Sequence, residues 1–201
     1  MFTGIIAAVG KISHAQPLEK GLRLTIEAPG LKLADVAIGD SVAHNGVCLT
    51  VIAKKKNSYQ IDVSRETLDC TVGLDTVGGE VNLEKAMRLS DFIGGHLVSG
   101  HVDGVGDVEK FEPVGESHEL VIKAPKALAK YIARKGSITV DGVSLTTNRV
   151  GGKGGRRFSI NLIPHTVEVT TLKRLHAGAK VNLEIDLIAR YVERMLTAGA
   201  A

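Results

Sequence analysis

Two short stretches of the sequence carry polar side chains at equivalent positions. Residues 44–51 read HNGVCLTV and residues 140–147 read VDGVSLTT, so Cys48 and Thr50 match Ser144 and Thr146. Hydroxyl groups donate and accept hydrogen bonds and can relay a proton, whereas a buried cysteine is more often a small apolar residue than a nucleophile. No neighbouring base in the sequence activates the thiol, so we expect Cys48 to position a ligand rather than attack it covalently.

Two histidines stand close together in the segment GGHLVSGHV, residues 94–102. Imidazole titrates near neutral pH, which makes His101 the best candidate for proton transfer. His96 and His101 also suggest a metal pair, but zinc needs three or four ligands and the sequence provides no further cluster. We therefore predict acid–base chemistry and no metal site.

The matching stretches belong to a long internal repeat. A shift of 96 positions superimposes Thr3-Gly4 on Ser99-Gly100 and continues without a gap until the segment GGKGGRR, which lengthens the second copy. The pairing then resumes, and VNLE occurs in both copies, at 81–84 and 181–184. A repeat of this length predicts two duplicated domains. We place them at 1–95 and 96–186, with 187–201 as a separate C-terminal segment.

Each copy has the pattern of a small antiparallel β-barrel. Short runs with alternating apolar residues, such as LRLTIEAP and SYQIDVS, are separated by turn residues. The dipeptides Asn45-Gly46 and Asp141-Gly142 predict tight hairpins, because both residue types tolerate positive φ. Short helical turns are expected after each Ala-Pro pair.

The C-terminal segment DLIARYVERMLTAG predicts an amphipathic helix with no counterpart in the first copy. One face carries the apolar residues Leu187, Ile188, Tyr191, Val192, Met195 and Leu196. The pattern leaves two interpretations open: the helix packs on its own barrel, or it joins subunits.

Composition excludes several classes of function. A net charge of +3 over 201 residues, with no Trp and 3% aromatic residues, argues against a nucleic-acid-binding surface. No apolar run is long enough to cross a bilayer, and the first residues lack the pattern of a secretory signal, so we expect a cytoplasmic protein that does not bind membranes. In that reducing compartment Cys48 and Cys70 are expected to be free thiols.

Five motifs spread along nearly the whole chain resemble those of the riboflavin synthase α-chain family: MFTGII, GGHLVSGHVDGVG, VDGVSLT, NLIPHT and VNLEID. The resemblance implies an all-β protein of two similar six-stranded antiparallel Greek-key barrels and a C-terminal α-helix, assembled as a homotrimer. It implies a transferase without a cofactor, which dismutates two molecules of 6,7-dimethyl-8-ribityllumazine by four-carbon transfer. The products would be riboflavin and 5-amino-6-(D-ribitylamino)uracil, in the last step of riboflavin biosynthesis.

The resemblance also implies where this reaction occurs. Each active site would bind two lumazine molecules between the first barrel of one subunit and the second barrel of its neighbour. Catalytic roles would fall to Cys48, His101, Ser144, Thr146 and Asp186, with Asp186 orienting the two hydroxyls. The pocket would be lined by Gly4, Ile5, Ile6, Cys48, Leu49, Thr50, Asp62, Val63, Ser64, Thr67, Gly100, His101, Val102, Lys135, Ser144, Leu145, Thr146, Leu162, Ile163, Pro164, His165 and Thr166. Lumazine synthase is a further partner that the resemblance raises.

The main alternative is a non-enzymatic antenna protein that shares the double barrel, binds one ligand and does not turn it over. Such a protein is expected to lose polar groups from one of its two pockets. This chain keeps His101, Ser144, Thr146 and Asp186 alongside Cys48, Thr50 and Thr67. The sequence therefore favours the enzyme.

Overall fold

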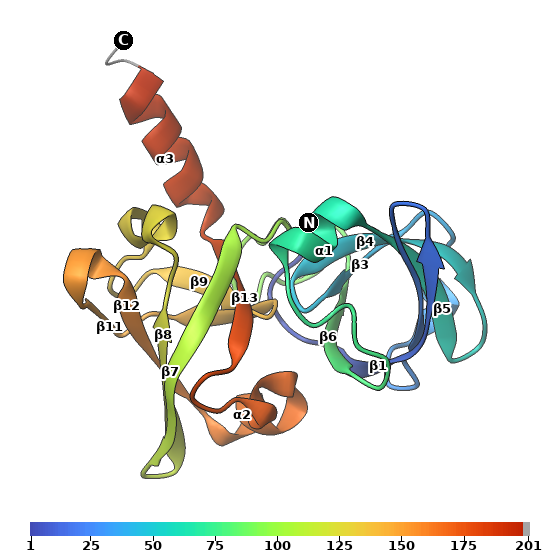
Figure 1. The fold of residues 1–201 in the computed structure, drawn as a ribbon, viewed down its shortest axis with the longest axis horizontal. Coiled ribbons are helices and arrows are strands. Elements are labelled where there is room, and N and C mark those ends of the chain that lie inside the picture. Colours follow the sequence, from blue (N-terminus) through green and yellow to red (C-terminus); the bar gives the residue numbers. More distant parts are fainter. Residues whose placement is uncertain (199–201) are drawn as a thin grey trace.

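Two β-barrels lie side by side, and the C-terminal helix α3 (Leu187–Ala198) projects away from the second (Figure 1). The structure, a computed structural model, describes residues 1–198. The strands of the first barrel are β1 (Ala8–Leu18), β2 (Gly21–Glu27), β3 (Ser41–His44), β4 (Val47–Lys54), β5 (Ser58–Ser64) and β6 (Glu80–Lys85). Those of the second are β7 (Gly104–Val114), β8 (Ser117–Lys123), β9 (Ser137–Val140), β10 (Val143–Thr146), β11 (Arg149–Gly151), β12 (Arg157–Leu162) and β13 (Lys180–Ile185).

Short helical elements connect these strands. They are η1 (Leu33–Asp35), α1 (Arg65–Cys70), η2 (Lys126–Tyr131), η3 (Lys153–Gly155), α2 (Pro164–Val169) and η4 (Thr171–Arg174). The turns η1 and η2 follow the two Ala-Pro pairs, as the sequence predicts. Helices α1 and α2 were not expected. Both follow a local start signal: Ser64 accepts a hydrogen bond from the Thr67 amide and caps α1, and Pro164 stands in the first turn of α2.

The first barrel is closed, with strand order β1-β2-β5-β4-β3-β6. Along β5, Tyr59, Ile61 and Val63 are buried, and the residues between them face outward. Successive side chains of a strand point to opposite faces, so this alternation fills the barrel interior with apolar groups and leaves polar groups on the outer wall. Ligand-binding side chains on these strands must therefore stand on the outer wall or at the strand ends.

The second barrel repeats this order with one strand interrupted. Its sheet runs β10-β9-β13-β7-β8-β12-β11, so the two end strands, β10 and β11, are consecutive in the sequence. Together they correspond to β4 of the first copy, and Thr147 and Asn148 separate them. The first copy shows a register shift at the same place, between Val51 and Ala53. The predicted pair of similar six-stranded barrels is confirmed, with a break where β4 has a bulge.

The two barrels meet through their predicted hairpins. Asn45 and Asp141 both have φ of 47°, and the glycines that follow have φ of 82° and 79°. A Cβ atom on Gly46 would lie 2.9 Å from the amide nitrogen of Gly142, and one on Gly142 would lie 2.7 Å from that of Gly46. The hairpin tips therefore approach too closely for any residue but glycine at either position.

Two asparagines link the barrels across this contact in a nearly symmetric manner. The Asn82 side chain donates to the Asp141 carbonyl over 3.0 Å, and the Asn182 side chain donates to the Asn45 carbonyl over 3.1 Å. In return, Asn45 and Asp141 each accept a 2.8 Å hydrogen bond from the backbone amide of the asparagine in their own barrel. The asparagine of the VNLE motif thus makes this junction in both copies.

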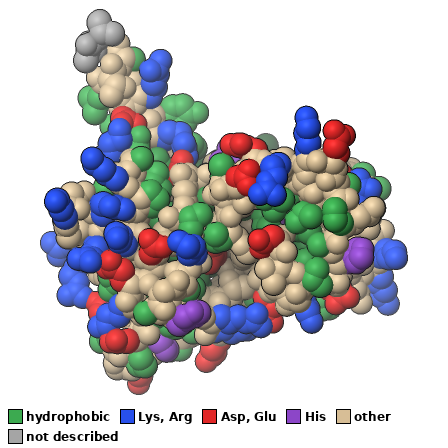
Figure 2. All heavy atoms as spheres, in the orientation of Figure 1, with side chains coloured by type: hydrophobic (Ala, Val, Ile, Leu, Met, Phe, Trp, Pro, Cys, Tyr) green, Lys and Arg blue, Asp and Glu red, His purple; other side chains and the backbone are tan. Residues whose placement is uncertain are grey.

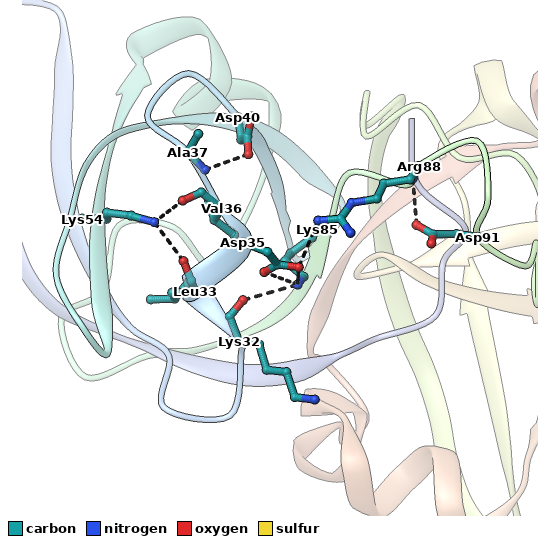
Figure 3. A network of polar contacts seen from close by, with 10 residues as sticks. All are labelled: Lys32, Leu33, Asp35, Val36, Ala37, Asp40, Lys54, Lys85, Arg88 and Asp91. Carbon is teal, nitrogen blue, oxygen red and sulfur yellow. Dashed lines mark hydrogen bonds and ion pairs between the residues drawn. The ribbon is translucent and has the colours of Figure 1, made fainter.

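A network of charged residues ties the linker after β6 to the first barrel (Figure 3). Asp35 on η1 binds Lys85 over 2.8 Å and Arg88 over 3.2 Å. Asp91 accepts a 2.7 Å hydrogen bond from the Arg88 amide, and Lys54 donates to backbone carbonyls of η1 and its neighbour. The network fixes the start of the linker that leads to the GGHLVSGHV segment.

Helix α3 does not pack its apolar face on its own barrel. Ile188, Met195 and Leu196 are 68–73% exposed, and the helix extends away from the sheet (Figure 1). Its contacts with the barrel are polar, including an ion pair between Arg190 and Asp103 at 2.8 Å. The prediction of an amphipathic helix is confirmed over Leu187–Ala198, and the last predicted residues, 199–201, lie outside the described part of the chain. Within residues 1–198, no helix is long and apolar enough to span a membrane.

Candidate active site

Each repeat begins with a turn that a buried glutamate holds in place. Glu84 accepts hydrogen bonds from the Thr3 amide and hydroxyl, both at 2.7 Å, and from the Gly4 amide at 2.9 Å. Glu184 does the same for Ser99, at 2.7 Å and 2.6 Å, and for Gly100, at 3.0 Å. Burial raises the pKa of Glu84, and the hydrogen bonds from Thr3 and Gly4 oppose that effect because they stabilise the charged form.

Each turn then crosses to a strand of the other barrel. The Gly4 carbonyl accepts a 2.8 Å hydrogen bond from the Ser144 amide, and the Gly100 carbonyl accepts one of 2.8 Å from the Cys48 amide. Both glycines have positive φ, and a Cβ on Gly4 would lie 2.6 Å from Cβ of Ser144. The two matching stretches that contain Cys48 and Ser144 therefore lie against equivalent turns, at Gly100 and Gly4 respectively.

The predicted pocket residues fall into two sets that the repeat relates. We define the first half-site as Cys48, Leu49, Thr50, Asp62, Val63, Ser64 and Thr67 with the crossing turn Gly100, His101 and Val102. The second half-site is Ser144, Leu145, Thr146, Leu162, Ile163, Pro164, His165 and Thr166 with the crossing turn Gly4, Ile5 and Ile6. Each half-site thus combines strands of one barrel with a turn that leads into the other. Lys135 stands beside the second half-site, on the loop before β9.

In the first half-site, the side chains of Leu49 and Val63 are buried in the barrel core, so only their backbone groups can face a ligand. Asp62 forms a two-point ion pair with Arg23, both contacts at 2.8 Å, and this guanidinium lowers the pKa of Asp62. Cys48 is half-buried and has no disulfide partner, as the sequence predicts. The half-site therefore offers hydroxyl, thiol and backbone groups and one neutralised carboxylate.

In the second half-site, an imidazole and a hydroxyl are in contact. His96 Nδ1 lies 2.7 Å from Ser144 Oγ. Burial lowers the pKa of His96, and the negative charge of Asp186 opposes this shift, so the neutral imidazole is favoured at neutral pH. The second ring nitrogen, Nε2, is buried and has no hydrogen-bond partner among residues 1–198. Buried polar atoms are rarely left unpaired in proteins, so this one points to a ligand or water at the site.

His96 is a candidate proton carrier that sequence reasoning missed. It precedes Ser144 by 48 positions and lies on the linker, so no strand pattern connects the two. Gly95 makes the contact feasible, because a Cβ there would lie 2.6 Å from Cβ of Ser144. The available signal was the pair of histidines in GGHLVSGHV, of which only His101 was predicted to transfer a proton.

Within residues 1–198, the side chains of His101 and Asp186 make no hydrogen bond with the other predicted catalytic residues. The His101 amide donates to Glu184 over 3.0 Å, and its exposed side chain makes no hydrogen bond with residues 1–198. Asp186 accepts a 2.9 Å hydrogen bond from the Ile188 amide at the start of α3, and it bonds neither Ser144 nor Thr146 within the described chain. Its effect on the site is the electrostatic one on His96.

The remaining residues of the second half-site form its far wall. Leu162 is buried in the core, whereas Ile163 is 57% exposed at the end of β12. Pro164, His165 and Thr166 form the first turn of α2, and the Thr166 carbonyl accepts a 2.7 Å hydrogen bond from Thr170. The first half-site has α1 in the same position, so both half-sites are closed by a short helix after a strand.

Comparison with known proteins agrees with this architecture. Two copies of the lumazine binding domain match residues 3–86 and 99–186. Among solved structures, LumP complexed with 6,7-dimethyl-8-(1'-D-ribityl) lumazine superimposes with a TM-score of 0.81 at 26% identity, over 92% of this chain and 99% of that one. LumP complexed with riboflavin gives a TM-score of 0.82 at 27% identity, with the same coverage. The fold and its two half-sites thus define a protein with two lumazine-binding domains.

Two curated relatives are more similar in sequence. Riboflavin synthase of Photobacterium phosphoreum is 48% identical over 197 residues, which cover 98% of this chain and 89% of the relative. Riboflavin synthase of Mycobacterium tuberculosis (strain H37Rv) is 42% identical over 201 residues, which cover 99% and 100%. The chain belongs to the riboflavin synthase family, and it is an enzyme of the transferase class.

Proposed function

We propose that this chain dismutates two molecules of 6,7-dimethyl-8-ribityllumazine. One molecule gives up a four-carbon unit to the other, which yields riboflavin and 5-amino-6-(D-ribitylamino)uracil in the last step of riboflavin biosynthesis. The observation that carries the proposal is the pair of half-sites, which have equivalent backbone positions but different side chains. One has Cys48 where the other has Ser144 in contact with His96. A reaction that uses one compound in two roles needs such a pair.

We assign proton transfer to the second half-site. One lumazine must lose a proton from its 7-methyl group to become a carbanion, while the other accepts the new bond. Neutral His96 can accept the Ser144 hydroxyl proton through Nδ1, which makes the serine oxygen a better acceptor for a proton of the ligand. Asp186 then favours the imidazolium that forms.

We assign binding and orientation to the first half-site. Cys48 has no base beside it in the described chain, so its thiol is expected to contact the ring rather than react. The amides and carbonyls of the strands can bind the ring edge, and Thr50, Ser64 and Thr67 add hydroxyls. Holding two rings face to face would itself contribute several kcal/mol, on the order of the effect of proximity in other enzymes.

We further propose that the active site is shared between subunits of a homotrimer. The apolar residues of α3 are exposed in the single chain, and their burial would stabilise an assembly. In that arrangement the first half-site of one subunit faces the second half-site of its neighbour. Association with lumazine synthase remains a proposal. We propose a cytoplasmic location, which the free thiols Cys48 and Cys70 support.

A binding protein without turnover is the second candidate, because the LumP complexes share the fold with TM-scores of 0.81 and 0.82. Incubation of the purified chain with the lumazine, followed by riboflavin fluorescence, separates the two. A steady rise in riboflavin supports the enzyme. Tight binding of the lumazine with no riboflavin formed would establish the binding protein instead.

A further inference from the structure

A cavity opens on the outer wall of the second barrel, beside the second half-site. It has a volume of about 560 Å³ and lies against β8, β12 and the loop before β9. Three cationic side chains and three neutral polar ones dominate its lining: Arg134, Lys135 and Arg149, with Asn148, Ser159 and Asn161. We call it the basic pocket.

The basic pocket continues from the second half-site along the same strands. Asn148 follows Thr146 by two residues, which is roughly 7 Å along an extended chain. The Asn148 amide donates to the Ser159 carbonyl over 2.8 Å, so the pocket wall is part of the barrel. Asn161 directly precedes Leu162 and Ile163 of the half-site. A ligand with its ring over Ser144 and Thr146 can therefore extend a side chain into the basic pocket.

The positive charge of the basic pocket is not neutralised by the described chain. Its carboxylate, Glu119, is bound by both Arg149 and Lys110, the latter at 3.1 Å. Lys135 contacts a neutral partner, the Asn148 side chain, at 3.3 Å. Arg134 forms no ion pair with any residue from 1 to 198. A site with this surplus favours an anionic ligand.

Lys135 is held in a backbone conformation that disfavours it. Its φ is +65°, whereas the equivalent position in the first copy is Gly39, with φ of +96°. Glycine adopts such angles without cost, and a lysine there persists only because the surrounding structure imposes it. A cationic side chain at a glycine position is thus a feature of the second copy that the fold does not require.

The first barrel lacks the whole cationic set. Arg134, Lys135 and Arg149 correspond to Ile38, Gly39 and Ala53. Glu119 and Asn161 face each other across neighbouring strands of the second barrel. The equivalent facing pair in the first barrel is Arg23 and Asp62, which form an ion pair. Basic side chains also gather over the second barrel in Figure 2. The two barrels therefore differ in charge at equivalent places.

We propose that the basic pocket binds the terminal phosphate of a ligand whose ribityl chain is phosphorylated, such as flavin mononucleotide, with the ring over Ser144 and Thr146. The inference rests on the proposed lumazine-binding role of the second half-site. Arginine binds phosphate through two parallel hydrogen bonds, and lysine adds a point charge, which suits the mixed set of cations. The first half-site, which has Ile38, Gly39 and Ala53 in place of the three cationic residues, takes only the uncharged ligand.

The test compares flavin mononucleotide with riboflavin on the full-length chain by quenching of flavin fluorescence at low salt. We expect tighter binding of the phosphorylated flavin at one site per chain. In the double variant Arg134→Ile, Arg149→Ala, which carries the residues of the first copy, its affinity should fall by about tenfold or more, while riboflavin affinity stays within about twofold. Added salt should weaken binding of the phosphorylated flavin alone in the unaltered protein.

Lys153→Ala is the matched control, because this exposed lysine lines a different cavity, beside α3. Loss of phosphorylated-flavin affinity in that variant and not in the double variant would overturn the proposal, as would equal affinities for the two flavins in the unaltered protein. Riboflavin formation from the lumazine is measured on the same sample. Turnover without a preference for the phosphorylated flavin defeats this inference alone, whereas the preference without turnover defeats the proposed reaction.

Discussion

His96 Nδ1 and Ser144 Oγ lie 2.7 Å apart. His96 lies on the linker between the barrels, and Ser144 lies on β10, which follows the Asp141-Gly142 turn. We expect His96→Gln and Ser144→Ala to lower turnover by roughly 10²- to 10⁴-fold, with small effects on lumazine affinity, since both groups act on the transferred proton. Steady-state kinetics and fluorescence binding measure the two quantities separately.

The comparison variants for this pair are His101→Gln and Cys48→Ser. Both should be milder, because the His101 side chain makes no hydrogen bond within residues 1–198 and Cys48 has no base to activate it. The acid limb of the pH–rate profile should disappear in His96→Gln, since it reports protonation of this imidazole, whose pKa burial lowers. A larger loss in His101→Gln than in His96→Gln would reverse the assignment.

His44 and Tyr59 form a 2.7 Å hydrogen bond inside the first barrel, where the second barrel has Val140 and Phe158. Burial lowers the pKa of His44 to about 4. The folded state thus resists protonation, so this contribution to stability is complete above about pH 6.5 and is lost as the pH falls toward 4. The loss should approach about 3 kcal/mol. Urea unfolding across this range measures it, and His44→Val, Tyr59→Phe should flatten the profile.

Ionisation of Asp141, at the junction of the barrels, is predicted to change stability with pH in the direction opposite to that of His44. Burial raises its pKa to about 7, whereas the equivalent Asn45 carries no charge. The folded state favours the protonated acid, so stability falls as the pH rises from about 3.8 to about 7 and is constant above that range. Asp141→Asn should therefore stabilise the protein at pH 8 by up to about 4 kcal/mol and change little at pH 4. Equal unfolding free energies of the two proteins at pH 8 would contradict this.

The exposed face of α3 carries the prediction about assembly. Met195→Glu with Leu196→Glu, or deletion of residues 187–201, should yield a folded monomer that has lost turnover, because the shared site cannot form. Arg194→Glu on the same helix should keep the assembly. Sedimentation velocity gives the oligomeric state, and a monomeric variant with full activity would rule out the shared site.

Much of the fold could be predicted because the sequence contains an internal repeat. The internal repeat aligns Gly4 with Gly100 before the insertion and Glu84 with Glu184 after it, and each pair makes the same contacts in the structure. The hairpin at Asn45 was predictable because positive φ restricts the residue types there. Local turn chemistry and repetition are both properties of the sequence alone.

The site was harder to predict, because its contacts join residues without a common pattern. The His96–Ser144 contact depends on the linker path and on Gly95, neither of which has a sequence period. Asp186 was expected to orient the hydroxyls, and in the described chain its Oδ1 accepts a hydrogen bond from the Ile188 amide at the start of α3. The break of the strand at Thr147 was not predicted either, and in the structure Thr147 pairs with the loop before β9, accepting a 2.7 Å hydrogen bond from the Lys135 amide and donating one of 3.0 Å to the Gly136 carbonyl.

The most direct measurement of the central claim is the stoichiometry of the reaction. Purified protein is mixed with 6,7-dimethyl-8-ribityllumazine as the sole substrate, and all species are quantified by chromatography over time. Two unequal half-sites that use one compound as donor and acceptor predict that two lumazine molecules disappear for each riboflavin and each 5-amino-6-(D-ribitylamino)uracil formed. Lumazine that stays bound and unconsumed, or riboflavin formed without the aminouracil, would contradict it.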